Sequence, residues 1–238
     1  MSQLDDHRDA AEPTPAGGFS RRNLIAAGVM GGLGVGLAAS PAPAEATDVP
    51  HAAAGPRGST VVEFRARIDQ AGITGEAFTS YGYLTRVTGT RRSDIFDSPT
   101  HDASTALLTA YASGNLRARV LDMAVHSLDI VGTMTVYQRR HGGADFSDPT
   151  SFTVGAPVAR YDLVLQDVLT VFSAGQGLPT LTGDMVQQSA RALNGPLAGL
   201  RFGQRGSRLR MFANGLGQLI DPATFKAQLE IAGNWSVE

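Results

Sequence analysis

The chain of 238 residues contains 28 Gly, 12 Pro and no Cys, and its 20 Lys and Arg side chains nearly balance 22 Asp and Glu side chains. This length, with 42% hydrophobic residues, suits one globular domain or a small pair, which excludes a collagen-like or wholly disordered chain. A net charge of −2 provides no basic field, so no nucleic-acid partner is expected. The lack of Cys excludes disulfides and thiolate metal sites.

The first 46 residues have the pattern of an export signal. Ser20, Arg21 and Arg22 stand directly before an uncharged run at residues 24–39. This arrangement resembles a twin-arginine signal, whose partner during export is the twin-arginine translocase. The run is shorter than the roughly 20 residues that span a bilayer, so no permanent membrane anchor is expected. The alternative is a cytoplasmic protein in which the arginine pair is incidental.

Small residues mark the predicted cleavage site, after Ala46 or, alternatively, after Ala44. Cleavage after Ala46 leaves a mature chain with 17 basic and 17 acidic residues, because residues 1–46 hold three Arg and five acidic groups. The protein is therefore predicted to be secreted or to reside in the cell envelope. Lys226 is the single lysine, a composition typical of GC-rich bacteria. Residues 47–60 are interpreted as a flexible lead-in, and residues 61–238 as one domain.

The domain begins with the clearest strand. Val62, Phe64, Ala66 and Ile68 alternate with polar side chains, as a half-buried strand requires. Further strands are predicted at residues 76–89, 105–112, 116–125, 126–139, 152–154, 158–166, 167–174, 181–192, 207–213 and 223–232. A hairpin turn is expected at Ser113-Gly114-Asn115, and loops at residues 90–104 and 140–157.

Short strands separated by Gly, Pro and Asn turns, without a long amphipathic helix, predict an all-β fold. A closed antiparallel β-barrel of about eight strands, calycin-like in its architecture, is favoured because closure removes exposed sheet edges. A β-sandwich is the alternative.

One segment resembles a known family. Residues 167–190, read as DVLTVFSAGQGLPTLTGDMVQQSA, resemble the strand, Gly-x-Gly turn and strand of the allene oxide cyclase and dirigent barrel proteins, with Gly175, Gly177 and Gly183 at the glycine positions. Asp97-Ser98-Pro99-Thr100 is similar to a short acidic segment of the dirigent proteins. The resemblance implies an eight-stranded barrel whose apolar cavity steers a reactive small molecule into one ring or stereoisomer. Its catalytic residues differ between branches and are not transferred.

The strand at residues 126–139 has one apolar face and one polar face, on which Asp129 lies among Ser, Thr and Tyr side chains. If the polar face lines the interior, a buried Asp129 would have a raised pKa suited to proton transfer. The candidate catalytic residues are then Asp129, Tyr137 and Arg191. The candidate substrate-binding residues are Tyr81, Tyr83, Thr133, Thr135 and Gln187. The alternative is that this face meets water and that each of these residues is a rim or ladder residue.

Oxygen-rich side chains gather in one predicted loop, at Asp94, Asp97, His101 and Asp102. Such groups hold divalent cations in some proteins, but no regular ligand spacing is present. We expect a solvated turn with side-chain caps, and neither a metal nor another cofactor.

Three functions are compatible with these patterns. The first is an exported isomerase or cyclase that binds an apolar small molecule in a cavity of several hundred cubic ångströms. The second is a non-catalytic ligand carrier or cell-envelope interaction protein, which a filled interior would favour. The third is a surface protein whose loops bind another protein and which shows an exposed apolar patch instead of a cavity. Assembly into a homo-oligomer is compatible with each of them.

Overall fold

The computed structural model describes residues 61–237, so the predicted export signal at residues 1–46 and the lead-in at residues 47–60 lie outside the described residues. The described chain forms eight strands: β1 (Val61–Gln70), β2 (Ala77–Val87), β3 (Leu108–Asp122), β4 (Val125–Gln138), β5 (Ala156–Ser173), β6 (Gln176–Ala190), β7 (Arg208–Asp221) and β8 (Lys226–Val237). Its helices are short: α1 (Arg92–Ile95), η1 (Pro149–Thr153) and η2 (Gly195–Leu197). None of the described helices is long and apolar enough to cross a membrane.

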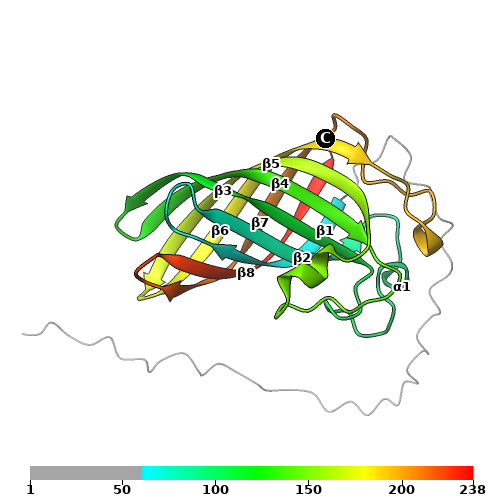
Figure 1. Cartoon of the computed structure of the whole chain (residues 1–238), viewed down its shortest axis with the longest axis horizontal. Helices are drawn as coiled ribbons and strands as arrows, with labels where there is room; N and C mark the ends of the chain where they lie inside the picture. Colours follow the sequence, from blue (N-terminus) through cyan, green and yellow to red (C-terminus); the bar gives the residue numbers. More distant parts are fainter. Residues whose placement is uncertain (1–60, 238) are drawn as a thin grey trace, which may run out of the picture. The chain divides into compact units, whose positions relative to one another are not determined.

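The strands form a closed barrel in chain order (Figure 1). Each strand pairs antiparallel with the next, and β8 returns to pair with β1, with Phe64 opposite Gly233. The predicted closed antiparallel barrel is therefore confirmed, and the alternative β-sandwich is excluded.

Three of the predicted boundaries are wrong. β3 runs through the expected turn at residues 113–115, because Gly114 pairs with Phe78 of β2 on one side and with Gly132 of β4 on the other. Residues 156–173 form one long strand instead of two. The short strand expected at residues 152–154 is instead the end of η1, which starts at Pro149 behind Asp148, whose side chain accepts a hydrogen bond from the Thr150 amide.

The two ends of the barrel differ (Figure 1). At one end, which we call the hairpin end, short turns at residues 71–76, 123–124, 174–175 and 222–225 join the strands in pairs. At the other, the loop end, the longer segments 88–107, 139–155 and 191–207 make the connections. In Figure 1 the hairpin end lies on the left and the loop end on the right.

Alternation of side chains gives the barrel a dry interior. Along β1 the apolar residues Val62, Phe64, Ala66 and Ile68 are buried, whereas Arg65 is exposed on the outer face. Similar alternation in the other strands gathers the aliphatic and aromatic side chains into one core. The pleat thus separates a hydrophobic lumen from a polar outer wall, as the sequence pattern predicts.

Glycines at facing positions allow neighbouring strands to curve sharply. A Cβ atom on Gly132 of β4 would lie 2.2 Å from the Ser113 carbonyl oxygen, and one on Gly114 of β3 would lie 2.2 Å from that of Val131. The same conflict occurs on the other side of the barrel, where a Cβ on Gly233 of β8 would lie 2.2 Å from the Phe212 oxygen. Such glycines permit the tight bends that close a small barrel.

We expect Gly132→Ala to lower the free energy of unfolding by at least about 2 kcal/mol, because a rigid carbonyl oxygen occupies the space that the new methyl group needs. Gly183→Ala is the matched control: its Cβ would meet the Met211 Cε atom at 3.0 Å, the far end of a flexible side chain. Urea unfolding of both variants measures the difference. Equal losses of stability would contradict this explanation of the bends.

Candidate functional site

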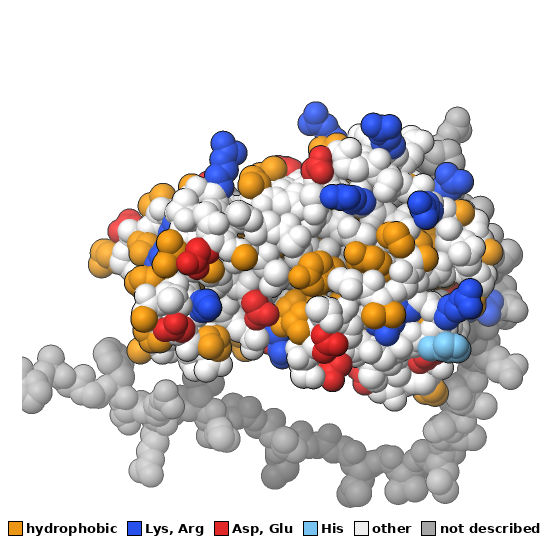
Figure 2. Space-filling model, viewed as in Figure 1, with side chains coloured by type: hydrophobic (Ala, Val, Ile, Leu, Met, Phe, Trp, Pro, Cys, Tyr) orange, Lys and Arg blue, Asp and Glu red, His pale blue; other side chains and the backbone are white. Residues whose placement is uncertain are grey.

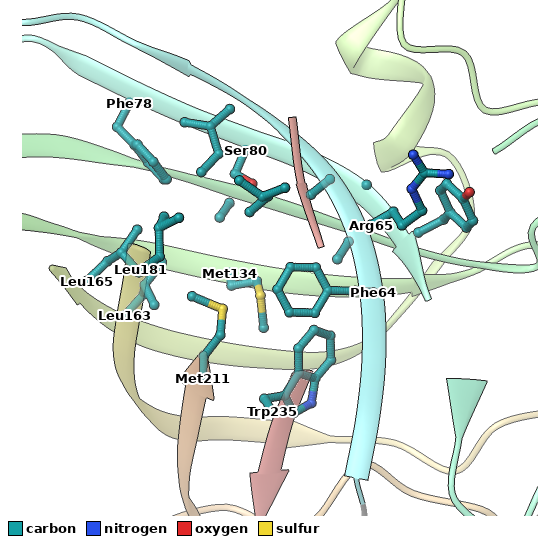
Figure 3. Close-up of a pocket in the computed structure, with 17 residues that line it drawn as sticks. Phe64, Arg65, Phe78, Ser80, Met134, Leu163, Leu165, Leu181, Met211 and Trp235 are labelled. Atoms are coloured by element: carbon teal, nitrogen blue, oxygen red, sulfur yellow. The ribbon is translucent and has the colours of Figure 1, made fainter. Parts of the chain in front are cut away.

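The centre of the barrel is nearly filled. The remaining central cavity measures about 40 Å³. Figure 3 shows its walls, where Phe64, Met134, Met211 and Trp235 converge. This volume has room for water but is far below the roughly 150 Å³ of apolar cavities that bind benzene. The cavity of several hundred cubic ångströms expected at the centre is therefore absent from the described structure, since bulky side chains occupy the space.

A larger cavity of about 180 Å³ opens at the hairpin end, and we call it the mouth cavity. Its apolar lining includes Leu128, Leu169, Val171, Leu219, Ala227 and Leu229. Glycines leave room for two of these side chains: a Cβ on Gly177 would lie 2.7 Å from Leu169, and one on Gly217 would lie 2.7 Å from Leu229. The four hairpin turns thus surround an apolar hollow within the barrel.

Five polar side chains take part in this lining: Gln70, Arg119, His126, Gln176 and Gln218. The Arg119 guanidinium donates a hydrogen bond to the Gly72 carbonyl oxygen and lies 4.4 Å from the centre of the Phe225 ring. Burial lowers the pKa of Arg119. Its contacts with the β1–β2 and β7–β8 turns show that Arg119 holds two hairpin tips together beside the opening.

Asp167 is the one carboxylate among the buried polar and charged residues of the described chain. It lies on the inner face of β5, opposite Leu128 of β4 and Leu181 of β6, with an exposed fraction of 0%. Leu128 lines the mouth cavity and Leu181 lines the central cavity. Asp167 itself lines neither cavity, but these two neighbours place it between them.

Neither carboxylate oxygen of Asp167 has a hydrogen-bond partner. Burial raises the pKa of Asp167 to about 7, although the nearby Thr180 amide, which does not complete a hydrogen bond, opposes the shift. Two further buried acceptors in the described chain lack a partner: Gln70 Oε1 at the mouth and Gln187 Oε1 toward the loop end. Since buried polar groups are normally satisfied, the unpartnered carboxylate of Asp167, with Gln70 Oε1 at the mouth, makes this end of the barrel the candidate functional site.

Gln187 was predicted to contact substrate, and the structure places it at the closed loop end instead. Its side-chain amide donates hydrogen bonds to the carbonyl oxygens of Ser189, at 3.1 Å, and of Phe202. The Tyr161 hydroxyl reaches the same Phe202 oxygen at 3.4 Å, and burial raises the pKa of this phenol. Gln187 therefore fastens segment 191–207 into the barrel and does not line either cavity.

The polar face of β4 is the outer face. Its alternate residues Leu128, Ile130, Met134 and Val136 are buried inside. The predicted site residues Asp129, Thr133, Thr135 and Tyr137 therefore lie on the outside of the barrel, and Asp129 is exposed. Arg191 is also exposed, beyond the end of β6. The structure does not bring Asp129, Tyr137 and Arg191 together around a cavity.

Tyr81 and Tyr83 also lie on the outer face, but segment 139–155 covers them. Tyr81 packs against Phe146 and Phe152, and its hydroxyl donates to Asp69 at 2.9 Å. Burial, followed by this hydrogen bond, raises the pKa of Tyr81 to about 12. Tyr83 packs against the Phe146 ring at 6.3 Å. Both tyrosines thus support a loop and are not interior donors.

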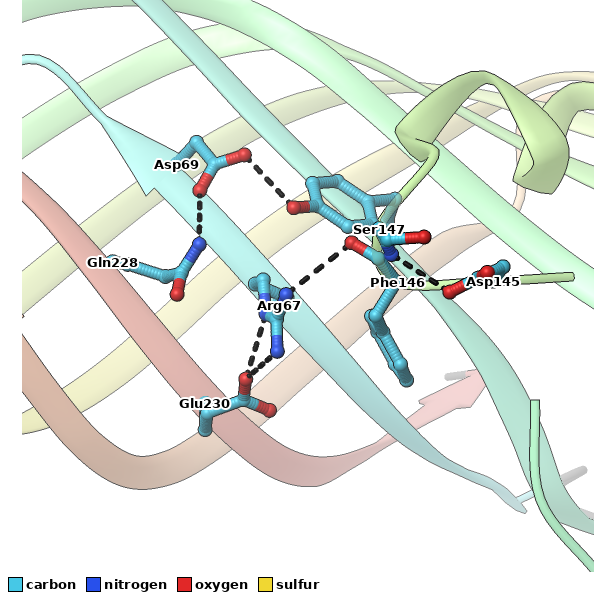
Figure 4. A network of polar contacts seen from close by, with 8 residues as sticks. Arg67, Asp69, Asp145, Phe146, Ser147, Gln228 and Glu230 are labelled. Atoms are coloured by element: carbon cyan, nitrogen blue, oxygen red, sulfur yellow. Dashed lines mark hydrogen bonds and ion pairs between the residues drawn. The ribbon is translucent and has the colours of Figure 1, made fainter.

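Figure 4 shows the polar network that holds this loop to the barrel wall. Arg67 of β1 forms an ion pair with Glu230 of β8 at 2.5 Å, donates to the Phe146 carbonyl oxygen at 3.2 Å and lies over the Phe146 ring. An open groove of about 610 Å³ lies beside the network, lined by both acidic and basic side chains. Its charged lining residues are Arg65, Asp102, Asp145 and Glu230. Glu230 pairs with Arg67, and the two aspartates accept hydrogen bonds from the backbone amides of Ser104 and Ser147, so three of the four already have structural partners and the mouth cavity is the stronger candidate site.

The predicted turn at residues 94–102 uses its carboxylates as backbone caps. Asp94 accepts from the Arg91 amide, Asp97 from the Gly142 amide at 2.6 Å, and Asp102 from the Ser104 amide at 2.9 Å. Within the described residues no group of three His, Cys, Asp or Glu side chains is arranged to hold a metal ion.

Comparison of the chain with protein-family models, curated proteins and solved structures gives no match. The candidate site therefore depends on the geometry of the mouth cavity and of Asp167 alone.

Asp167 was not among the predicted site residues, because residues 158–166 and 167–174 were predicted as two separate strands. Along the undivided strand, Tyr161, Leu163, Leu165, Asp167 and Leu169 follow each other at every second position. A carboxylate in an otherwise apolar alternation predicts a buried charge. That signal was present in the sequence.

Asp167 should make the stability of the fold depend on pH. Its pKa is about 7 in the folded protein and about 3.9 in an unfolded chain, so between these values the folded state retains a proton that the unfolded state loses. This contribution is complete below about pH 4 and is lost as the pH rises through 7. Relative to Asp167→Asn, the wild type should lose about 2–3 kcal/mol of stability between pH 5 and pH 8.

Urea unfolding at both pH values measures this difference. The control is Asp162→Asn, which removes an exposed carboxylate from the outer face of the same strand. An identical pH dependence in wild type and Asp167→Asn would contradict a raised pKa.

Proposed function

We propose that the protein binds a small, largely apolar molecule in the mouth cavity and that Asp167 recognises a hydrogen-bond donor or positive charge on it. The observation that carries this proposal is a buried carboxylate without any partner, placed next to an apolar cavity that opens at the barrel end. A protein gains no stability from such a group, because its desolvation is not compensated.

The size of the cavity supports a ligand of about one ring. Its volume of about 180 Å³ exceeds that of engineered apolar cavities of roughly 150 Å³ that bind benzene. The leucine and valine lining favours an apolar body for the ligand.

The unpartnered acceptors of the site indicate the polar group that the ligand carries. Both oxygens of Asp167 and Oε1 of Gln70 are acceptors without partners, whereas the cation at the mouth, Arg119, already contacts Gly72 and Phe225. A ligand that supplies an N–H, O–H or ammonium group would satisfy these acceptors. A charge-assisted hydrogen bond of this kind contributes about 1.5–3 kcal/mol.

Leu169 lies between the mouth cavity and Asp167 along β5. It is the next inward-facing residue of β5 on the mouth side and is only partly buried. A change of its rotamer would connect the mouth cavity to the carboxyl group. The proposal therefore requires a movement of the Leu169 side chain for a ligand to reach Asp167.

We expect benzylamine to bind in the mouth cavity and Asp167→Asn to weaken that binding by about tenfold or more, since the ammonium group loses its charged acceptor. Toluene, which has no donor, should bind equally to both proteins. NMR titrations measure the affinities, and the shifts should occur at Leu128, Leu169 and Leu229. Asp162→Asn serves as the control. Shifts confined to the outer groove, or equal loss of toluene binding, would contradict the proposal.

A second candidate function is an isomerase or cyclase acting on the same ligand, as the sequence resemblance implies. The observation that favours it is the pKa of Asp167, which is raised to about 7 by burial. A carboxyl group of this pKa can both give and take a proton near neutral pH, which is the requirement for general acid–base catalysis. Asp167 would be its catalytic residue.

Catalysis by Asp167 predicts exchange of α-protons in a bound ketone. In D₂O we expect the protein to accelerate deuteration of phenylacetone, with a rate that rises through about pH 7 and falls about 100-fold in Asp167→Asn. NMR follows the exchange. Binding of phenylacetone without exchange that depends on Asp167 would contradict the catalytic function and favour the non-catalytic carrier, which the nearly filled centre also supports.

Export remains part of this proposal. The arginine pair and the apolar run in residues 1–46 support translocation through the twin-arginine pathway, with the protein secreted or held in the cell envelope. Twin-arginine substrates cross folded, which suits a domain without cysteines.

A further inference from the structure

Large exposed hydrophobic side chains gather at the hairpin end. We define the apolar rim as eight of them, contributed by all four hairpins: Ile73, Val120, Leu121, Met123, Val125, Phe172, Ile220 and Phe225. Six others lie elsewhere: Val154, Val164, Leu178, Val186, Phe212 and Leu216. Figure 2 shows hydrophobic side chains at this end, on the left, among acidic and basic ones. Isolated exposed hydrophobics are ordinary, but a ring of them around a cavity is not.

Two rim residues, Met123 and Phe225, have a positive φ angle, which non-glycine residues rarely adopt. Met123 has φ 47° and Phe225 has φ 53°, in the left-handed region where turns normally place Gly or Asn. Met123 is 95% exposed, so packing does not compensate the backbone strain. A strained, water-exposed methionine at a hairpin tip indicates a surface that is covered in the working state of the protein.

The charges at this end are balanced. Residues 71–77, 117–126, 171–177 and 219–227 contain Glu76, Asp122 and Asp221 against Arg117, Arg119 and Lys226, with His126 in addition. An apolar surface without net charge matches a zwitterionic lipid interface and offers no attraction to an anionic partner.

The rim is not a flat patch, because its members stand on four separate hairpins around the mouth cavity. A rigid partner or a second copy would have to match four tips and cover the opening between them, whereas fluid lipid conforms to any such outline. Phe225 belongs to both the rim and the cavity lining, so apolar surface continues from the tips into the barrel.

We propose that the hairpin end docks on the surface of a zwitterionic bilayer, with the rim side chains inserted at the interface and the mouth cavity facing the lipid. The docking does not depend on the function proposed above. If that function also holds, an apolar ligand dissolved in the bilayer reaches the mouth cavity without crossing water.

The experiment uses single labels on the full chain, which has no native Cys. Met123→Cys and, separately, Ile220→Cys are labelled with an NBD fluorophore and mixed with phosphatidylcholine vesicles that carry nitroxide-labelled lipid. Val154→Cys is the matched control, since Val154 is 55% exposed but lies outside the rim. We expect at least about threefold quenching of both rim labels and little quenching of the control label.

Rim labels that stay unquenched would overturn the proposal. Quenching of the control label to the same extent as the rim labels would also overturn it, because the vesicles would then contact another part of the chain. Quenching only when phosphatidylglycerol is added would overturn the zwitterionic assignment. A blue shift of the rim labels that grows with protein concentration, without vesicles, would point to a second copy instead. Asp167→Asn should leave the quenching unchanged, which separates this test from ligand binding.

Discussion

Closure of the sheet by the pairing of β1 with β8 is the constraint on which the other features depend. Once the barrel is closed, each strand has one face without access to water, and every side chain on that face must fit the lumen. Gly114 and Gly132 allow the required bend, while Phe64 and Trp235 fill the space. The same closure that stabilises the aliphatic residues also removes water from Asp167.

The two ends of the barrel differ because the segments that connect the strands differ in length. At the loop end, segment 191–207 reaches inward, and Phe202, with 1% exposure, fills the opening. At the hairpin end the turns are too short to fold back over the lumen, so the mouth cavity stays open. The short turns also leave Met123 and Ile220 in water. The open cavity and the apolar rim therefore share one origin in the hairpin connections.

The fold class could be predicted from the sequence because alternation such as that of Val62 to Ile68 depends on local geometry. The ends of the strands were harder to predict from the sequence. Gly114 and Asn115 are turn residues by local preference, but pairing with β2 and β4 on both sides holds them in β3. Which face of β4 points inward was left open, because apart from Asp129 its polar face carries Ser, Thr and Tyr side chains that a polar lumen could also hold. Which face becomes the lumen depends on closure, a property of all eight strands together.

The contrast between two buried polar residues on neighbouring strands clarifies the role of Asp167. Gln187 on β6 is as fully buried, and its Oε1 atom also lacks a partner, yet its Nε2 atom donates to two carbonyl oxygens and holds the loop end. The carboxylate oxygens of Asp167 on β5 accept no hydrogen bond that would hold another segment, and burial disfavours the charged form of this side chain. A leucine would fit the surrounding apolar layer without that cost. The structural role evident for Gln187 is therefore missing at Asp167, and recognition of a molecule that enters from the mouth is the role that its position supports.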